Sequence, residues 1–199
     1  MKVSREQAAA NRERVLDTAS YLLRERGYEG IGIAALMQSA GLTHGGFYGQ
    51  FASKQALAGE VCSRSLSRAA EKWRRLASAA PRNPLRALAE DYLSDRHLKG
   101  MGEGCVLPAL SADAARASGP VGAAMTTGVR GLAGILAESL PDSPDQEGRS
   151  LAMLAQMVGG LLLARAVDDP ILQQQLLDAS RAAILEQGQA EPGQSQASS

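Results

Sequence analysis

IAALMQSAGLTHGGFYGQFASK, residues 33–54, is the stretch of the sequence that decides the fold. Its first part carries apolar residues at helical spacing, and Gly41 then supplies a residue that adopts a positive φ without steric cost. Thr43 is the expected N-cap of a second short helix. Two short helices joined by such a turn predict a helix-turn-helix, whose second helix enters the major groove of DNA by its N-terminal end. A helical hairpin that binds nothing is the alternative interpretation.

The composition of the 199-residue chain favours an all-α protein. Hydrophobic residues make up 45% of it, with few aromatics and few runs of β-branched residues. No apolar segment of a secretory signal follows the polar N-terminus, and the longest apolar run, residues 158–164, is far too short to cross a bilayer. We therefore expect a cytoplasmic protein without a membrane partner.

The residues that usually carry catalysis or bind metals are sparse and scattered. Cys62 and Cys105 lie far apart and lack the spacing of metal ligands. No glycine-rich phosphate loop follows a predicted strand, and His44 and His97 have no nucleophile at a recognisable spacing. The sequence therefore predicts no enzyme, no cofactor and no metal site.

The charge is distributed unevenly, although the whole chain has a net charge of zero. Residues 1–75 hold 12 Lys and Arg against 7 Asp and Glu, whereas residues 76–199 hold 9 against 14. A local basic surface is enough to neutralise phosphates, so the N-terminal part suits DNA while the rest stays acidic. A chance difference between the two parts is the alternative explanation.

Helical periodicity, capping residues and prolines predict seven more helices outside the opening stretch. Ser4, Ser53 and Asp169 are expected to cap three of these helices. Gly27 is expected to end the first of them, and the glycine-rich residues 99–104 are expected to form a loop. Residues 188–199 have the composition of a disordered tail. The seven predicted helices cover residues 4–26, 53–79, 83–97, 105–117, 120–140, 144–167 and 170–187.

Three motifs in residues 12–57 together form a specific pattern. They are a helix that ends in Gly27-Tyr28, an IAxxAG-like helix that reaches Gly41, and T-x-x-x-F-Y-x-x-F-x-S-K-x-x-L from Thr43 to Leu57. With these motifs the chain resembles the TetR family of bacterial transcriptional regulators. The remainder shares only the helix count and amphipathic character of that family.

The resemblance implies an all-α, nine-helix architecture with three parts. Residues 1–52 would be the helix-turn-helix DNA-binding domain, residues 53–187 a helical effector-binding and dimerisation domain, and residues 188–199 a tail. It also implies a homodimer built by the last two helices as a four-helix bundle. A small-molecule effector would bind in a pocket enclosed mainly by helices four to eight.

The resemblance also assigns roles at the DNA surface, residue by residue. Thr43, Tyr48 and Lys54 would contact phosphates, His44 and Gly45 would approach base edges, and Gln50 would lie near the DNA backbone. From the residues alone, the alternative for His44 and Lys54 is a solvated surface side chain, and Tyr48 can pack in the core as well as contact a phosphate.

Two departures from the family pattern concern the opening stretch. Gly32 stands where many members have Thr or Ser, so an N-cap worth about 1 kcal/mol is missing. Gln50 replaces a frequent His or Tyr. In addition, the glycines at positions 45, 46 and 49 weaken the second helix by about 1 kcal/mol each relative to alanine. We therefore expect this helix to become fully ordered only on DNA.

Two further sets of residues are expected to serve the effector and the second subunit. Methionines adapt to varied ligands, which favours them as lining of an apolar pocket, although core residues have the same pattern. The predicted pocket residues are Cys62, Leu66, Trp73, Tyr92, Met101, Cys105, Met125, Val129, Leu132 and Met153. The predicted dimer residues are Leu154, Val158, Leu161, Leu162, Leu172, Leu176 and Ile184.

These expectations combine into one functional hypothesis with two alternatives. The chain would be a homodimeric repressor that binds a pseudo-palindromic double-stranded operator and releases it when a small, apolar effector binds. In one alternative Cys105, at the start of a predicted helix, senses electrophiles or oxidants, although such a cysteine is also explained as a small core residue. In the other, the chain is a helical module that binds another protein.

Overall fold

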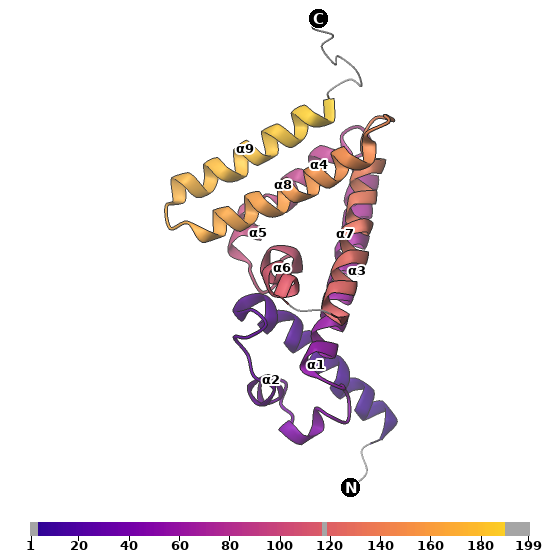
Figure 1. Ribbon diagram of the computed structural model, residues 1–199, viewed down its shortest axis with the longest axis vertical. Coiled ribbons are helices and arrows are strands. Elements are labelled where there is room, and N and C mark those ends of the chain that lie inside the picture. Colours follow the sequence, from indigo (N-terminus) through magenta and orange to yellow (C-terminus); the bar gives the residue numbers. More distant parts are fainter. Residues whose placement is uncertain (1–3, 117–118, 190–199) are drawn as a thin grey trace, which may run out of the picture. The chain divides into compact units, whose positions relative to one another are not determined.

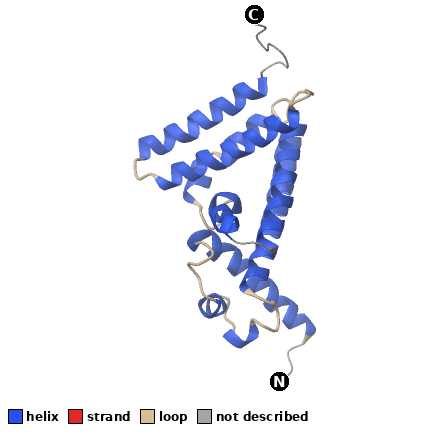
Figure 2. Ribbon diagram, in the orientation of Figure 1, coloured by secondary structure: helices blue, strands red, loops and turns tan. Residues whose placement is uncertain are grey.

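The structure, a computed structural model, describes residues 4–116 and 119–189. All regular structure in this part of the chain is helical, which confirms the predicted all-α class (Figures 1 and 2). None of the described helices is long and apolar enough to cross a membrane. The elements are α1 (Arg5–Arg26), α2 (Ile33–Ser39), the 3-10 helix η1 (His44–Gly46), α3 (Lys54–Ala79), α4 (Pro84–Tyr92), α5 (Asp95–Lys99), α6 (Val106–Arg116), α7 (Pro120–Glu138), α8 (Gln146–Ala166) and α9 (Pro170–Gln189).

The helices form two compact units, each assembled from two segments of the chain. The N-terminal unit lies within residues 1–69 and 100–128, and the C-terminal unit within residues 70–99 and 129–199. The N-terminal unit thus contains α6 and the first parts of α3 and α7, in addition to the residues predicted to bind DNA. The boundary predicted at residue 52 concerns a division of function and stays a prediction.

The N-terminal unit is organised around α1, which contacts both α2 and α6. The hydroxyl of Ser4 caps α1 by accepting a hydrogen bond from the Gln7 amide at 3.1 Å, as predicted. Gly27 ends α1 with a φ of +72°, a conformation that side chains resist. The buried apolar residues of this core include Val15, Leu16, Ala19, Leu23, Leu36, Met37, Phe47 and Leu57.

In the C-terminal unit α8 and α9 run side by side, α4 contacts α9 and α5 contacts α8 (Figure 1). Gly160 permits the close approach of α8 to α9, because a Cβ there would lie 2.3 Å from the Ser180 hydroxyl oxygen. Asp169 caps α9, accepting hydrogen bonds from the amides of Ile171 at 2.8 Å and Leu172 at 3.3 Å.

Two predicted helix boundaries in this unit are wrong. The helix expected over residues 83–97 is two helices, α4 and α5, because the Ser94 hydroxyl donates to the Asp91 carbonyl and accepts from the His97 amide, which starts a new helix. Gly188 and Gln189, which were expected in the tail, belong to α9. Residues 190–199 lie outside the described part.

Candidate nucleic-acid interface

The turn after α2 has the geometry that the sequence predicts. Gly41 has a φ of +69°, which only glycine adopts without strain. Its amide donates to the Gln38 carbonyl at 2.9 Å, and the amide of half-buried Leu42 donates to the Met37 carbonyl at 2.9 Å. At the other end of α2, Gly32 provides no side-chain cap, also as predicted.

The second helix of the motif is shorter than predicted. It consists of η1, whose backbone hydrogen bonds join residues three apart, followed by a single helical turn. In that turn the Phe51 amide donates a hydrogen bond to the Phe47 carbonyl at 2.9 Å. Thr43 makes no side-chain cap, so that prediction is wrong as well. The glycines at positions 45, 46 and 49 explain the difference, because they favour the unfolded chain over a regular helix.

Aromatic packing holds this segment in place despite its short helix. Phe47 is fully buried and Phe51 is 4% exposed, with ring centroids 5.6 Å apart. The guanidinium of Arg12 lies 4.7 Å from the centre of the Phe51 ring. A rigid base of this kind positions the side chains that point away from it.

The side chains predicted to reach DNA lie mainly on the exposed side of this base. Thr43, His44 and Gly45 are exposed, and Tyr48 is 63% exposed. The rings of His44 and Tyr48 meet edge to face, with centroids 6.1 Å apart. Together they offer hydroxyl and imidazole groups of the kind that contact phosphates and base edges.

Gln50 faces the protein more than the other predicted contacts. Its Nε2 donates to the Gly46 carbonyl at 3.1 Å, and its Oε1 is buried without a hydrogen-bond partner among the described residues. A buried acceptor without a partner costs free energy. The side chain therefore supports the short turn at some cost, which a rearrangement of the segment would relieve.

Lys54 begins α3 beside the same surface. The Ser53 hydroxyl caps this helix by accepting from the Ala56 amide at 3.0 Å, as predicted, and the open amides of a helix N-terminus attract anions. The Lys54 ammonium lies 4.3 Å from the centre of the Tyr28 ring. Tyr28 thus positions the Lys54 ammonium for its predicted contact with a phosphate. The Gly27-Tyr28 motif in the sequence did not indicate this role.

Known proteins match the chain both in sequence and in fold. The family model of bacterial regulatory proteins of the tetR family matches residues 15–61, which include the segment described above. The HTH-type transcriptional repressor NemR of Escherichia coli strain K12 is 28% identical over 132 residues, covering 65% of this chain and 66% of NemR, just under two thirds of that relative's length. The sequence match to the tetR family thus lies in the N-terminal part of the chain.

Solved structures of TetR-family proteins have the same fold. The reduced form of E. coli NemR superimposes with a TM-score of 0.76 at 24% identity, over 89% of this chain and 97% of that one. A regulator from Agrobacterium tumefaciens gives 0.77 at 20% identity, over 92% and 100%. AibR, solved with isovaleryl coenzyme A and operator DNA, gives 0.62 at 17% identity, over 87% and 97%. Likeness at these sequence identities shows the fold alone.

The residues predicted to line an effector pocket lie in both units. Cys62, Leu66, Met101, Cys105 and Met125 belong to the N-terminal unit, and the other five to the C-terminal unit. Most of them are buried, but Met101 is 40% exposed. In the C-terminal unit the rings of Trp73 and Tyr92 meet edge to face at 5.7 Å. Their role in effector binding stays a prediction.

The two cysteines have different surroundings. Cys62 is buried, and burial raises the pKa of its thiol to about 11. Cys105 is half-buried just before α6, and its Sγ accepts a hydrogen bond from the Leu107 amide at 3.5 Å. The guanidinium of Arg24 interacts electrostatically with both thiols. No cluster of metal-binding side chains occurs within residues 4–116 and 119–189.

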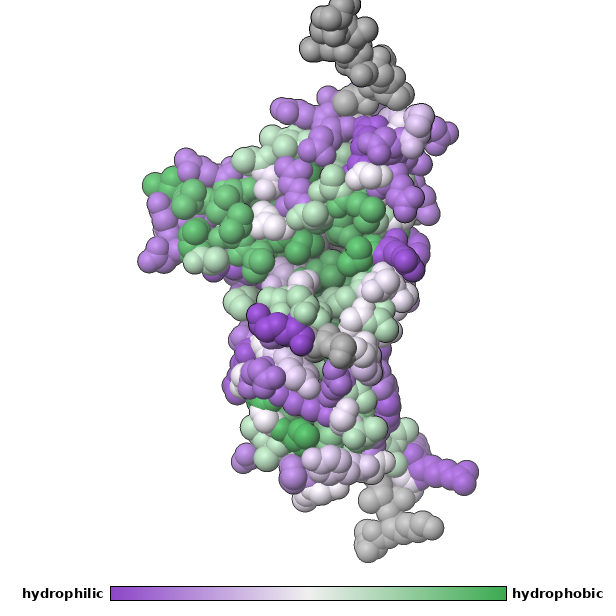
Figure 3. Space-filling view, viewed as in Figure 1, coloured by the Kyte–Doolittle hydropathy of each residue, from purple (hydrophilic) through white to green (hydrophobic). Residues whose placement is uncertain are grey.

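The residues predicted for dimerisation divide into three groups. Leu154, Leu161 and Ile184 are buried within the protomer itself. Val158 and Leu176 are half-buried, and Leu162 and Leu172 are 47% and 40% exposed. The sequence did not single out three other exposed apolar residues on the same two helices, Leu151, Leu163 and Ile171. Figure 3 shows a hydrophobic area over α8 and α9.

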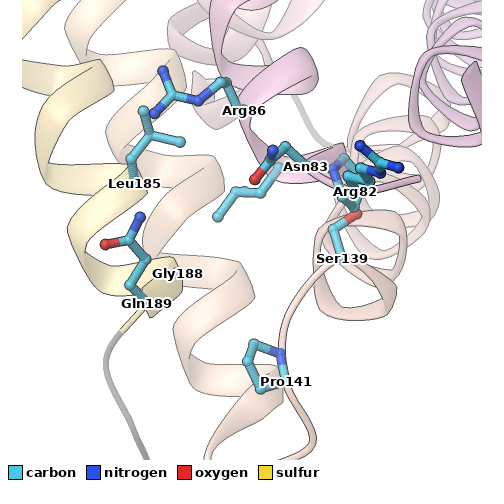
Figure 4. A pocket seen from close by; sticks show the side chains of 10 residues that line it. Arg82, Asn83, Arg86, Ser139, Pro141, Leu185, Gly188 and Gln189 are labelled. Atoms are coloured by element: carbon cyan, nitrogen blue, oxygen red, sulfur yellow. The ribbon is translucent and has the colours of Figure 1, made fainter. Parts of the chain in front are cut away.

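A cavity of about 280 Å³ lies at the end of the C-terminal unit (Figure 4). It is open to solvent, and no residue predicted for the effector pocket lines it. Its lining includes the exposed side chains of Arg82, Asn83 and Arg86 at the start of α4, and Gln189 at the end of α9.

Proposed function

We propose that this chain is a TetR-family regulator, a homodimeric repressor that binds a pseudo-palindromic operator and releases it when a small, apolar effector binds. The observation that carries the proposal is the exposed group of Thr43, His44 and Tyr48 on a rigid aromatic base, beside the capped N-terminus of α3. NemR is named a repressor, and AibR was solved with both a coenzyme A ester and operator DNA. We extend to this chain the pairing of a bound effector with operator DNA, with an apolar effector in place of the coenzyme A ester.

The proposed DNA contacts divide by chemistry. Tyr48 and Lys54 present a hydroxyl and an ammonium to phosphates, which fixes orientation and gives a salt-dependent affinity. His44 precedes the base-facing turn and reads an acceptor such as guanine O6 or N7. Two copies related by a two-fold axis then read two half-sites, which is why we expect a pseudo-palindrome.

The proposed dimer uses the exposed apolar residues of α8 and α9. Leu162, Leu163 and Ile171 are 47%, 55% and 71% exposed, and large apolar side chains gathered on one face mark an interaction site. Isologous pairing of α8 and α9 from two protomers would bury this face in a four-helix arrangement. Leu162→Glu should therefore yield monomers in analytical ultracentrifugation, while Ser78→Glu, at an exposed position of α3, should leave the dimer intact.

Selection of DNA fragments bound by the purified protein, followed by a salt titration, tests the main proposal. We expect an enriched pseudo-palindrome and an affinity that falls steeply as salt rises. Tyr48→Phe and Lys54→Gln should each weaken binding, and Lys54→Gln should also reduce the salt slope. Salt-insensitive binding without an enriched palindrome would contradict the proposal, and a stable complex with another protein would favour the helical-module alternative.

A second candidate function makes Cys105 the input instead of a bound effector. Its half-buried thiol, with Arg24 and a backbone amide beside it, has the electropositive surroundings of reactive cysteines. With N-ethylmaleimide the sulfur would add to the alkene carbon and the thiol proton would end on the neighbouring carbon. The raised pKa of buried Cys62 keeps that thiol protonated and makes it the matched control.

Release of DNA by N-ethylmaleimide distinguishes this candidate. Cys105→Ser should abolish the release, and Cys62→Ser should preserve it. Release that persists in Cys105→Ser would refute the thiol input and leave the non-covalent effector as the proposal.

A further inference from the structure

The chain passes between its two compact units at three points. Two of these crossings lie inside helices, in α3 after residue 69 and in α7 after residue 128. The third follows α5, where residues 100–105 form a loop that leads into α6 of the N-terminal unit. Within the described residues, this is the crossing at which the backbone is not helical.

Arg24, in the last turn of α1, holds this loop. Its Nε–H donates to the Gly102 carbonyl oxygen at 2.6 Å, and its Nη1 donates to the Ser65 hydroxyl of α3 at 3.2 Å. One guanidinium thus joins α1, α3 and the loop. Partial burial lowers the pKa of the Arg24 guanidinium, and the Gly102 carbonyl and Ser65 hydroxyl that it binds are neutral. A buried cation is costly, whereas charge-assisted hydrogen bonds are strong and directional, which suits a residue that positions other groups.

The loop also lies as close to α1 as its backbone permits. Gly102 is buried, and a Cβ at this position would lie 2.4 Å from the Cε2 atom of the Tyr21 ring. Any side chain at residue 102 would therefore push the loop away from α1 or displace the ring. The same residue, Gly102, supplies the carbonyl oxygen to which Arg24 donates.

We propose that Arg24 is a positioning residue that couples the C-terminal unit to α1 through Gly102, in addition to the route along α3. The inference rests on the proposed function, because a regulator must connect its effector to its DNA contacts. A displacement of the loop after α5 changes the geometry of the Arg24 hydrogen bonds, which weaken steeply with distance and angle. By thermodynamic linkage, DNA binding at residues 43–54 must then also change the conformational equilibrium of the loop.

Hydrogen exchange of the full chain, with and without DNA, tests this coupling. The probe is a duplex recovered from a random-sequence pool by binding to the wild-type protein. We expect the duplex to slow exchange in residues 100–105 by about fivefold or more, the lower end of usual couplings between sites. In Arg24→Met, which keeps the length of the side chain, slowing in residues 54–61 should remain, while slowing in residues 100–105 should fall below about twofold.

Three more variants sharpen the test. Gly102→Ala disturbs the same contact from the other side, against the Tyr21 ring, and should give the same loss. Arg24→Lys keeps a cation and a donor and should restore part of the slowing. The matched control is Arg64→Gln, which removes the ion pair of Arg64 with Glu13 at 2.7 Å between α3 and α1 but no loop contact. It should respond as the wild type does.

The outcomes separate the coupling from the proposed function. If Arg24→Met and Gly102→Ala keep the slowing in residues 100–105, or if Arg64→Gln loses it equally, the coupling is refuted. A wild-type protein that binds a duplex but shows no slowing in the loop also refutes it. If the wild type recovers no duplex from the pool, the proposed function fails and the coupling falls with it.

Discussion

Replacing Gly49 with alanine should strengthen DNA binding. Gly49 follows η1 in the segment that we propose to read DNA, and this segment has only a 3-10 turn and one helical turn in the structure. A longer helix must form if the segment is to enter the major groove as a helix. Alanine reduces the conformational entropy that the unbound segment loses when this helix forms.

The structure permits this substitution without strain. Gly49 is not among the glycines with positive φ, and a Cβ there would lie 3.9 Å from the Gly46 carbonyl oxygen, an ordinary contact. The difference in helix propensity is about 1 kcal/mol per copy, or about a fivefold gain in the binding constant. For a dimer that uses both copies, the gain is roughly 30-fold.

Fluorescence anisotropy with a selected duplex measures the affinity, and circular dichroism reports the helix gained on binding. We expect Gly49→Ala to bind more tightly and to gain less helix on DNA than the wild type. Gly41→Ala is the matched control, because its φ of +69° strains any side chain, so that variant should bind more weakly. If Gly49→Ala binds no more tightly and gains as much helix as the wild type, the ordering argument is refuted.

Three other predictions concern stability. Gly131→Ala, whose Cβ would meet nothing within 4 Å, should raise the free energy of unfolding in urea by about 1 kcal/mol. Gly128→Ala, one turn earlier in α7, places a Cβ 2.3 Å from Leu66 and should lower the free energy of unfolding by about 1–3 kcal/mol. Equal changes in the two variants would contradict this packing argument. Asp169→Ala should cost about 1 kcal/mol in thermal unfolding because it removes the cap of α9, whereas Asn83→Ala, which removes no capping bond, should cost less than about 0.5 kcal/mol. Burial lowers the pKa of His97 to about 4, so the unfolded chain takes up a proton near pH 6.5 while the folded chain does not, and stability should fall as the pH drops from about 6.5 to about 4. Denaturation at a series of pH values checks this, and His97→Gln should flatten the dependence.

Local signals in the sequence were sufficient for the architecture. The positive φ of Gly41 and the caps by Ser4, Ser53 and Asp169 follow from chemistry within a few residues, and the structure has them all. The segment after Thr43 was harder, because helical periodicity of the aromatics competed with three glycines. Phe47 and Phe51 are buried as a helical face would bury them, but the glycines limit the regular helix to a short turn.

Residues that depend on distant contacts could not be found in this way. Periodicity marks α8 as apolar on nearly all sides, so it does not tell buried Leu161 from exposed Leu162 beside it. Arg24 had no signal at all, since its partner Gly102 lies 78 residues away in the chain. Similarly, the break between α4 and α5 depends on which backbone groups the Ser94 hydroxyl bonds.

The discontinuous make-up of the two compact units has a consequence for synthesis on the ribosome. Because residues 100–128 complete the N-terminal unit, α1 cannot contact α6 until more than half of the polypeptide has been synthesised. The contacts between α1 and α6 are therefore of high sequence separation, and contacts of this kind slow folding. A nascent chain that stalls near residue 69 would expose the apolar side of α1, which makes this interval the time when chaperones matter most.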